Sequence, residues 1–375
     1  MTVDHADAEL LGETVRAAMR QLSSSEAVRR AMATTGGWEA PLWRRLSGEL
    51  GLAGLATPAT YGGAGAGFVE LAYAFEETGA SLLCAPFFGT AALALPLLLA
   101  AGDEDVLTTF APDLVAGELT ATAALLEDDG LWAPTGGAMT ARRHDDQWLL
   151  DGTKNYVIDG TTAGLVLTVA ITDDGPQIFA VVAQALGLQR QRLVSLDQTR
   201  KLARLVFDGT PARRLKCAAP AVAVHRAIAV ARAMMAAEQA GGTRRCLDVT
   251  KEYVQTRYQF ARPVGSFQMV KERLADMLIQ TESARSAAYA AARALDDDAD
   301  VLRTTLAARI VCNDAYTFVT AQMIQLHGGI GFTWEHDAHL YFKRARSSAQ
   351  LLGDTHVCIE ELAAELAAAA NGSLR

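Results

Sequence analysis

The hydrophobic positions divide the chain into three stretches with different periodicities. Up to about residue 117, and again from about residue 218, Ala and Leu recur at the three- and four-residue spacing of amphipathic helices. Between residues 120 and 211, short segments rich in Val, Ile, Thr and aromatic residues are separated by turn signals such as Asp151-Gly152. This order predicts helices, then antiparallel strands, then helices again.

The individual elements follow from the same pattern. Helices are predicted over 68–79, 221–257, 266–295, 300–327 and 355–370, with a possible irregularity in the first long helix at Gly241-Gly242. Strands are predicted over 147–150, 156–158, 165–171 and 177–182. We therefore predict an α+β protein with an N-terminal helical domain (1–117), a central antiparallel β domain (118–215) and a C-terminal four-helix bundle (216–375).

Composition narrows the classes of function. Lys plus Arg is 34 and Asp plus Glu is 43, a formal net charge of −9, which argues against a nucleic-acid-binding protein. The five cysteines form no CxxC pair, and His336 and His339 lack further residues at metal-ligand spacing, so no disulfide framework and no metal site are predicted.

The sequence also bears on the compartment. The first 13 residues are polar and acidic, unlike a secretory signal. The apolar run over 87–101 is interrupted by Gly89 and Pro96, which favours a buried helix over a membrane span. We expect a cytoplasmic protein with no membrane span.

Three turns contain residues suited to chemistry. The corner from Arg257 to Gln268 joins two predicted helices, where an arginine and a helix N-terminus suit a pyrophosphate; a corner with solvated side chains is the plainer alternative. The glycines after Gln325 allow close backbone approach to a ligand, or only end a helix. Asp354 or Thr355, just before the last helix, is suited to cap it, and a cap explains this segment at least as well as a catalytic role.

Taken together, these motifs resemble those of the acyl-CoA dehydrogenase family, over about residues 50–366. The segment Tyr61–Gly65 resembles the family's N-terminal helix–loop, and Lys154–Gly160 resembles its K-x-W-I-T-N-G segment. The most diagnostic similarity lies in the C-terminal region, with Arg257, Phe260, Pro263, Phe267-Gln268, Leu274–Met277 and Gln325 … His327-Gly328-Gly329 … Gly331.

The resemblance implies a function and a cofactor. Members of the family bind FAD, remove the α-proton of an acyl-CoA thioester with a glutamate and transfer a hydride from the β-carbon to flavin N5. In this family the C-terminal motif residues reach the FAD of the neighbouring subunit. The matching residues here are Arg257, Phe260, Gln268, Gln325, Gly328 and Gly329.

The chain departs from the family at the flavin ring. The family's T-E-P-x-A-G-S-D segment corresponds to Leu125–Gly130, with Leu126 where a flavin-bonding Thr is expected. In the second segment Tyr156 replaces Trp and Ile158 replaces Thr. Loss of two hydroxyl donors costs about 0.5–1.5 kcal/mol each in flavin binding.

It also departs at the catalytic base. The two positions where the family places its glutamate correspond to Leu352 and Ala231, neither of which accepts a proton. Three nearby carboxylates remain as weaker candidates: Asp354, Glu238 and Glu127.

The resemblance and the departures lead to one main hypothesis. The chain is expected to be a subunit of a heterotetrameric, FAD-dependent acyl-CoA dehydrogenase, similar to actinobacterial enzymes of steroid degradation, in which it completes the FAD site of a catalytic partner. An electron-transfer flavoprotein is the expected acceptor. Two alternatives stay open: a self-sufficient homo-oligomeric acyl-CoA or acyl-carrier dehydrogenase with an unusual base such as Asp354, and a non-catalytic scaffold protein of the same fold.

Overall fold

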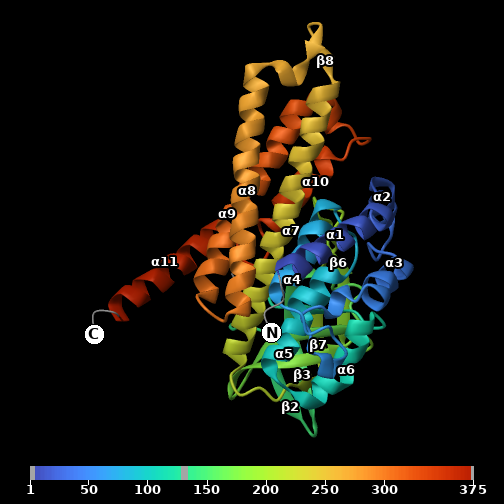
Figure 1. The fold of residues 1–375 in the computed structure, drawn as a ribbon. Helices are drawn as coiled ribbons and strands as arrows, with labels where there is room; N and C mark the ends of the chain where they lie inside the picture. Colours follow the sequence, from blue (N-terminus) through green and yellow to red (C-terminus); the bar gives the residue numbers. More distant parts are fainter. Residues whose placement is uncertain (1–4, 128–133, 373–375) are drawn as a thin grey trace. The chain divides into compact units, whose positions relative to one another are not determined.

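The computed structural model describes residues 5–127 and 134–372 (Figure 1). The N-terminal helices are α1 His5–Leu22, α2 Ser25–Ala33, α3 Ala40–Arg44, α4 Phe68–Ala80, α5 Leu95–Ala101 and α6 Glu104–Ala116, with short η1 Arg45–Glu49, η2 Leu52–Gly54, η3 Ala59–Tyr61 and η4 Phe88–Ala94. The strands are β1 Ala121–Ala124, β2 Thr140–His144, β3 Gln147–Ile158, β4 Leu165–Thr172, β5 Gly175–Val182, β6 Leu188–Arg192 and β7 Leu202–Arg214. The C-terminal elements are α7 Pro220–Thr256, β8 Tyr258–Gln259, β9 Arg262–Pro263, η5 Val264–Ser266, α8 Gln268–Asp296, α9 Val301–His327, η6 Gly328–Phe332, α10 Ala338–Ser348 and α11 Thr355–Gly372.

The residues group into two compact units, each built from several chain segments. Unit 1 contains residues 1–29, 68–83 and 232–375, and unit 2 contains residues 30–67 and 84–231. The predicted architecture of helices, a central sheet region and further helices is confirmed. The predicted domain boundaries at 117 and 215 remain a prediction, because the units combine segments from different parts of the sequence.

Unit 2 is organised by a seven-stranded sheet. The pairings β2–β3, β3–β7, β4–β5, β5–β7 and β6–β7 are antiparallel, as the turn signals predict, but β1–β4 and β2–β4 are parallel. The sheet is therefore mixed. Its apolar core includes Phe179, Leu205 and Phe207, each almost fully buried.

The helices of unit 2 explain the apolar run at 87–101. This segment forms η4 and α5, and most of its side chains are buried, as predicted. Gly89 brings η4 close to β1, since a Cβ there would lie 3.0 Å from the carbonyl oxygen of Ala121. None of the helices in the described part of the chain combines the length and apolar character needed to cross a membrane.

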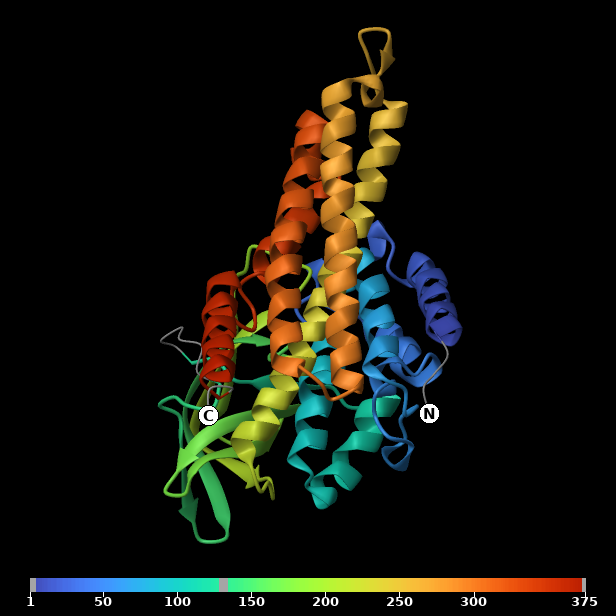
Figure 2. The ribbon, with the colours of Figure 1, turned by 60° about the vertical axis from the view of Figure 1, so that its left-hand side comes forward.

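Unit 1 is a bundle in which the long helices α7, α8 and α9 run side by side, as Figures 1 and 2 both show. Their predicted bounds agree with the structure to within two residues. The sequence did not predict α10, the short helix between α9 and α11. Helix α11 packs on α9 and leaves the bundle axis (Figure 1).

Close packing of α4 against α7 depends on glycine. A Cβ on Gly79 of α4 would lie 2.1 Å from the carbonyl oxygen of Glu238, and a Cβ on Gly241 of α7 would lie 1.8 Å from that of Glu76. The neighbouring Gly242 lies against the ring of Tyr316. The irregularity predicted at Gly241-Gly242 was therefore wrong: α7 is continuous there, and the glycines serve helix contact.

We expect Gly241→Ala to lower the free energy of unfolding by at least about 1–3 kcal/mol, because the clash is with rigid backbone rather than a flexible side chain. Gly329→Ala is the matched control, since no atom lies within 4 Å of its Cβ position. Denaturant titration measures both variants. Equal unfolding midpoints would contradict the packing argument.

Candidate functional site

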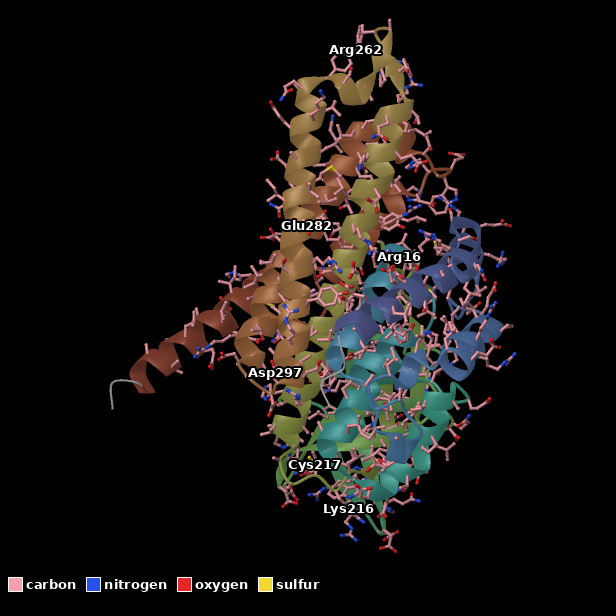
Figure 3. The ribbon with its side chains drawn as sticks, in the orientation of Figure 1. Arg16, Lys216, Cys217, Arg262, Glu282 and Asp297 are labelled. Carbon is pink, nitrogen blue, oxygen red and sulfur yellow. The ribbon has the colours of Figure 1, made fainter. Side chains whose placement is uncertain are left out.

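The first group of candidate residues lies at the corner between α7 and α8, the tip at which Figure 3 labels Arg262. Arg257 follows the last turn of α7, and its carbonyl oxygen accepts a hydrogen bond from Val264 N–H at 2.8 Å, which closes the β8–β9 hairpin. Phe260 is 88% exposed at the hairpin turn. Phe260 and Ala261 both have positive φ, 52° and 61°, the backbone of a two-residue turn that glycine adopts at lower cost.

Gln268 is the first residue of α8 and is exposed. Its Nε2 donates to Glu272 Oε1 at 3.1 Å, one turn along the same helix. Beside it, the Arg262 guanidinium lies 3.9 Å from the centre of the Phe267 ring. The corner thus presents arginine, amide and aromatic side chains together on an exposed surface.

The second group lies where α9 ends. Gln325 is exposed, and Gly328 has φ 64° and ψ −141°, a conformation that essentially only glycine adopts. Gly328 is therefore required by the fold. Gly329 is different, because its φ is not positive and no atom lies within 4 Å of a Cβ built there.

The two corners are tied to each other within unit 1. The Tyr253 ring of α7 stacks on His327 with ring centres 4.3 Å apart, and its hydroxyl donates to the His327 carbonyl oxygen at 3.3 Å. Burial lowers the pKa of His327, so the stacked ring is neutral near pH 7. Arg273 of α8 donates to the side-chain oxygen of Gln322 of α9. The structure therefore brings all six candidate FAD-binding residues to one end of the bundle, on exposed positions.

The turn between α10 and α11 contains Leu352, one of the two residues that the family resemblance matches to the catalytic glutamate. Leu352 is 8% exposed and has φ 63°, a left-handed conformation that is uncommon for a side chain of this size. Arg232 Nε donates to the Leu352 carbonyl oxygen at 3.0 Å, and Arg309 Nη2 donates to those of Ser348 and Leu351 at 2.9 and 3.0 Å. This turn is thus held by two buried guanidinium groups.

Neither usual base position offers a proton acceptor. Ala231, the second position, is fully buried on α7.

The two guanidinium groups at the turn differ in their charge partners. Arg232 forms a bidentate ion pair with Glu361 of α11, at 2.6 and 3.0 Å. Arg309 is fully buried, and its pKa falls to about 10 because of desolvation.

The remaining carboxylates are held in structural contacts. Asp354 caps α11, since its Oδ1 accepts a hydrogen bond from Val357 N–H at 2.9 Å, as the sequence predicts. Glu238 is 6% exposed and pairs with Arg344 at 3.1 Å.

Glu127 is the third carboxylate, and it lies in unit 2. It accepts hydrogen bonds from Lys154 Nζ at 2.8 Å and from the N–H groups of Ala138 and Met139 at 2.6 and 3.1 Å. Burial alone would raise its pKa, but these hydrogen bonds outweigh it, and the pKa is lowered. Glu127 is therefore an anion bound to Lys154 and to the backbone of Ala138 and Met139, and a poor base.

The residues compared with the family's flavin-ring contacts also lie in unit 2. Leu126 is half-buried, and its carbonyl oxygen accepts from Asn155 N–H at 2.8 Å. Tyr156 is 48% exposed and has φ 51°, whereas Ile158 is 4% exposed. Residues 128–130 of the compared segment lie outside the described residues.

Sequence reasoning missed the buried arginines. Arg232 and Arg309 each stand alone among apolar neighbours, in Ala229–Ala233 and Ala307–Cys312. A single charge on an apolar stretch of helix was the available signal. Their hydrogen-bond partners lie about 40 to 130 residues away in the sequence. The pattern of the sequence therefore could not predict which residues they bind.

Comparison with known proteins decides the family. Residues 6–118 match the model of the acyl-CoA dehydrogenase N-terminal domain, and residues 221–367 match that of the C-terminal domain. The chain belongs to the acyl-CoA dehydrogenase family. It is 34% identical over 359 residues to the acyl-CoA dehydrogenase IpdE2 of Mycobacterium tuberculosis, covering 96% of each chain.

Solved structures also resemble this chain over nearly its whole length. The chain matches a structure of the steroid acyl-CoA dehydrogenase Tcur3481–Tcur3483 with TM-score 0.89 and 30% identity, covering 98% of this chain and 99% of the other. It matches the ChsE4–ChsE5 complex from Mycobacterium tuberculosis with TM-score 0.89 and 28% identity, covering 98% of each. Members of this family of oxidoreductases are FAD-dependent acyl-CoA dehydrogenases.

We expect Glu127→Gln to lower the free energy of unfolding at pH 7 by about 3–5 kcal/mol, because the buried Lys154 ammonium loses its carboxylate partner. A lowered carboxylate pKa stabilises the fold above the ordinary Glu value, and this stabilisation is lost as the pH falls through the folded-state pKa. The variant should therefore lose less stability than wild type on acidification below about pH 4. Urea titrations across pH test this, with the exposed Glu118→Gln as control; parallel pH profiles for Glu127→Gln and wild type would contradict it.

Proposed function

We propose that this chain is a non-catalytic subunit of a heteromeric acyl-CoA dehydrogenase, and that it completes the FAD site of a catalytic partner subunit. The main support for the proposal is that neither residue matched to the family's catalytic glutamate can accept a proton. Leu352 and Ala231 are apolar and buried, and arginines donate hydrogen bonds to the carbonyl oxygens of the turn containing Leu352. The carboxylate in that turn, Asp354, caps α11.

The space beside that turn is also occupied. Arg232 Nη2 lies 3.1 Å from the position of a Cβ on Gly353, the residue after Leu352. The same guanidinium is paired with Glu361 of α11. An ion pair therefore lies next to the position that we compare with the family's base, and residue 352 itself offers no group that accepts a proton.

The other half of the proposal concerns FAD. Arg257 presents a guanidinium at an exposed corner, where it suits the pyrophosphate of FAD, and the amides of Gln268 and Gln325 supply donors and acceptors. FAD accepts the hydride of the reaction when it is bound. The role of these residues is to bind and orient the cofactor.

Gly329 gives this assignment independent support. Unlike the other glycines compared in the described part of the chain, it has neither a positive φ nor a neighbouring atom near its Cβ position. The fold of this chain alone thus gives no reason for glycine there. Close approach of a ligand or a second subunit does give one.

The partner is proposed to contribute the flavin ring pocket and the glutamate. Leu126 and Ile158 lack the hydroxyls that the family uses at the ring, and the Ile158 side chain is buried. Relatives support a second subunit, because the matched ChsE4–ChsE5 structure is a complex of two proteins.

The substrate of the assembly is proposed to be an acyl-CoA thioester, with a steroid-derived acyl group suggested by the matched steroid acyl-CoA dehydrogenase. We propose an electron-transfer flavoprotein as the acceptor. The five cysteines are free thiols, four of them buried, which fits the proposed reducing cytoplasm.

Gly329→Ala, introduced into the complex of this chain with its partner, is expected to weaken FAD retention by at least about tenfold while leaving the unfolding midpoint of this chain unchanged. The added methyl group enters the space assigned to the cofactor. Flavin absorbance after gel filtration measures retention. Arg257→Ala should act in the same direction through loss of phosphate pairing.

Lys251→Gln, an exposed charge change on α7, is the control for Arg257→Ala. Full flavin retention in both Gly329→Ala and Arg257→Ala would overturn the assignment of this end of the bundle to FAD.

A further inference from the structure

A cavity of about 500 Å³ lies within unit 1, and none of the residues assigned above to FAD lines it. Its walls come from α1, the turn into α2, the end of α4, the middle of α7 and the start of α10. The volume is in the range of small-molecule sites in proteins. All of its lining residues belong to unit 1, so the cavity lies within one compact unit of the chain.

The charged part of the wall is rich in arginine. Arg16 and Arg20 lie one turn apart on α1, and Arg244 and Arg245 are adjacent on α7. Arg16, labelled in Figure 3, and Arg244 both bind the buried Glu77, with N–O distances of 2.8 to 3.1 Å. The carboxylate of Glu77 therefore holds two guanidinium groups in fixed positions.

A second lining acid is also neutralised. Asp337 Oδ1 accepts from Arg29 at 2.7 Å and from the Ser25 hydroxyl at 2.8 Å. Arg20 and Arg245, by contrast, have no carboxylate within ion-pair distance among the described residues, although Arg245 interacts with the Tyr341 hydroxyl. Both side chains are exposed at the cavity and available to an anion.

The lining also includes apolar side chains. Met19, Val28, Leu82 and Leu340 are each less than 5% exposed. Leu82 has φ 51°, a strained conformation for this side chain that costs about 1–2 kcal/mol. Strain of this kind is concentrated at functional sites.

We propose that this cavity binds a small amphiphilic monocarboxylate, with the carboxylate between Arg20 and Arg245 and the apolar body against Met19, Val28 and Leu340. A guanidinium pairs with a carboxylate in a bidentate manner. Asp248, the remaining lining acid, disfavours a doubly charged phosphate. The inference is independent of the proposed role in FAD binding.

Isothermal titration of the full chain with octanoate tests the proposal. We expect saturable binding at one site, weakened at least about tenfold in R20Q/R245Q, a double variant at exposed positions that should fold normally. The charge-matched control K251Q/K271Q changes two exposed lysines outside the cavity and should bind as wild type does. Thermal unfolding of each variant verifies that the fold is intact.

Acetate, which has the head group without the apolar body, should bind at least about tenfold more weakly than octanoate. Absence of saturable octanoate binding would overturn the proposal. So would equal affinities in R20Q/R245Q and wild type, or acetate binding as tight as that of octanoate.

Discussion

Two buried guanidinium groups hold the turn between α10 and α11, and the functional account depends on them. Arg232 and Arg309 donate to three carbonyl oxygens of residues 348–352, and Arg232 is neutralised by Glu361. Burying a charge is costly unless it is paired and hydrogen-bonded, so these contacts are required once the arginines are inside. They hold Leu352, the residue that we compare with the family's base position, in a buried and left-handed conformation.

At the C-terminal ends of α7 and α9, a ring contact rather than a buried charge fixes the structure. Stacking of Tyr253 on His327 joins the α7–α8 corner to the end of α9, so that two motifs far apart in the sequence form one exposed surface. The arginine, the amides and the uncrowded glycine on this surface are exposed and do not contribute to the core of this chain. This surface suits a cofactor bound jointly with a second subunit.

The sequence predicted the long helices well, because three- and four-residue periodicity is a local signal that persists over many turns. It also predicted the Asp354 cap, which depends on residues three apart. It could not predict the parallel pairing of β1 with β4, the contact of Gly241 with α4 or the Glu127–Lys154 pair, since each joins residues far apart in the chain. The candidate FAD-binding residues came from a family resemblance; their common location came from the structure.

The central claim is that FAD binds only when a partner subunit is present, and flavin absorbance tests it most directly. The chain should be colourless when purified alone, and should carry about one FAD per pair of chains when it is co-purified with a partner subunit of the same family. A chain that is fully flavinated on its own would contradict the account and would return attention to Asp354 as a base.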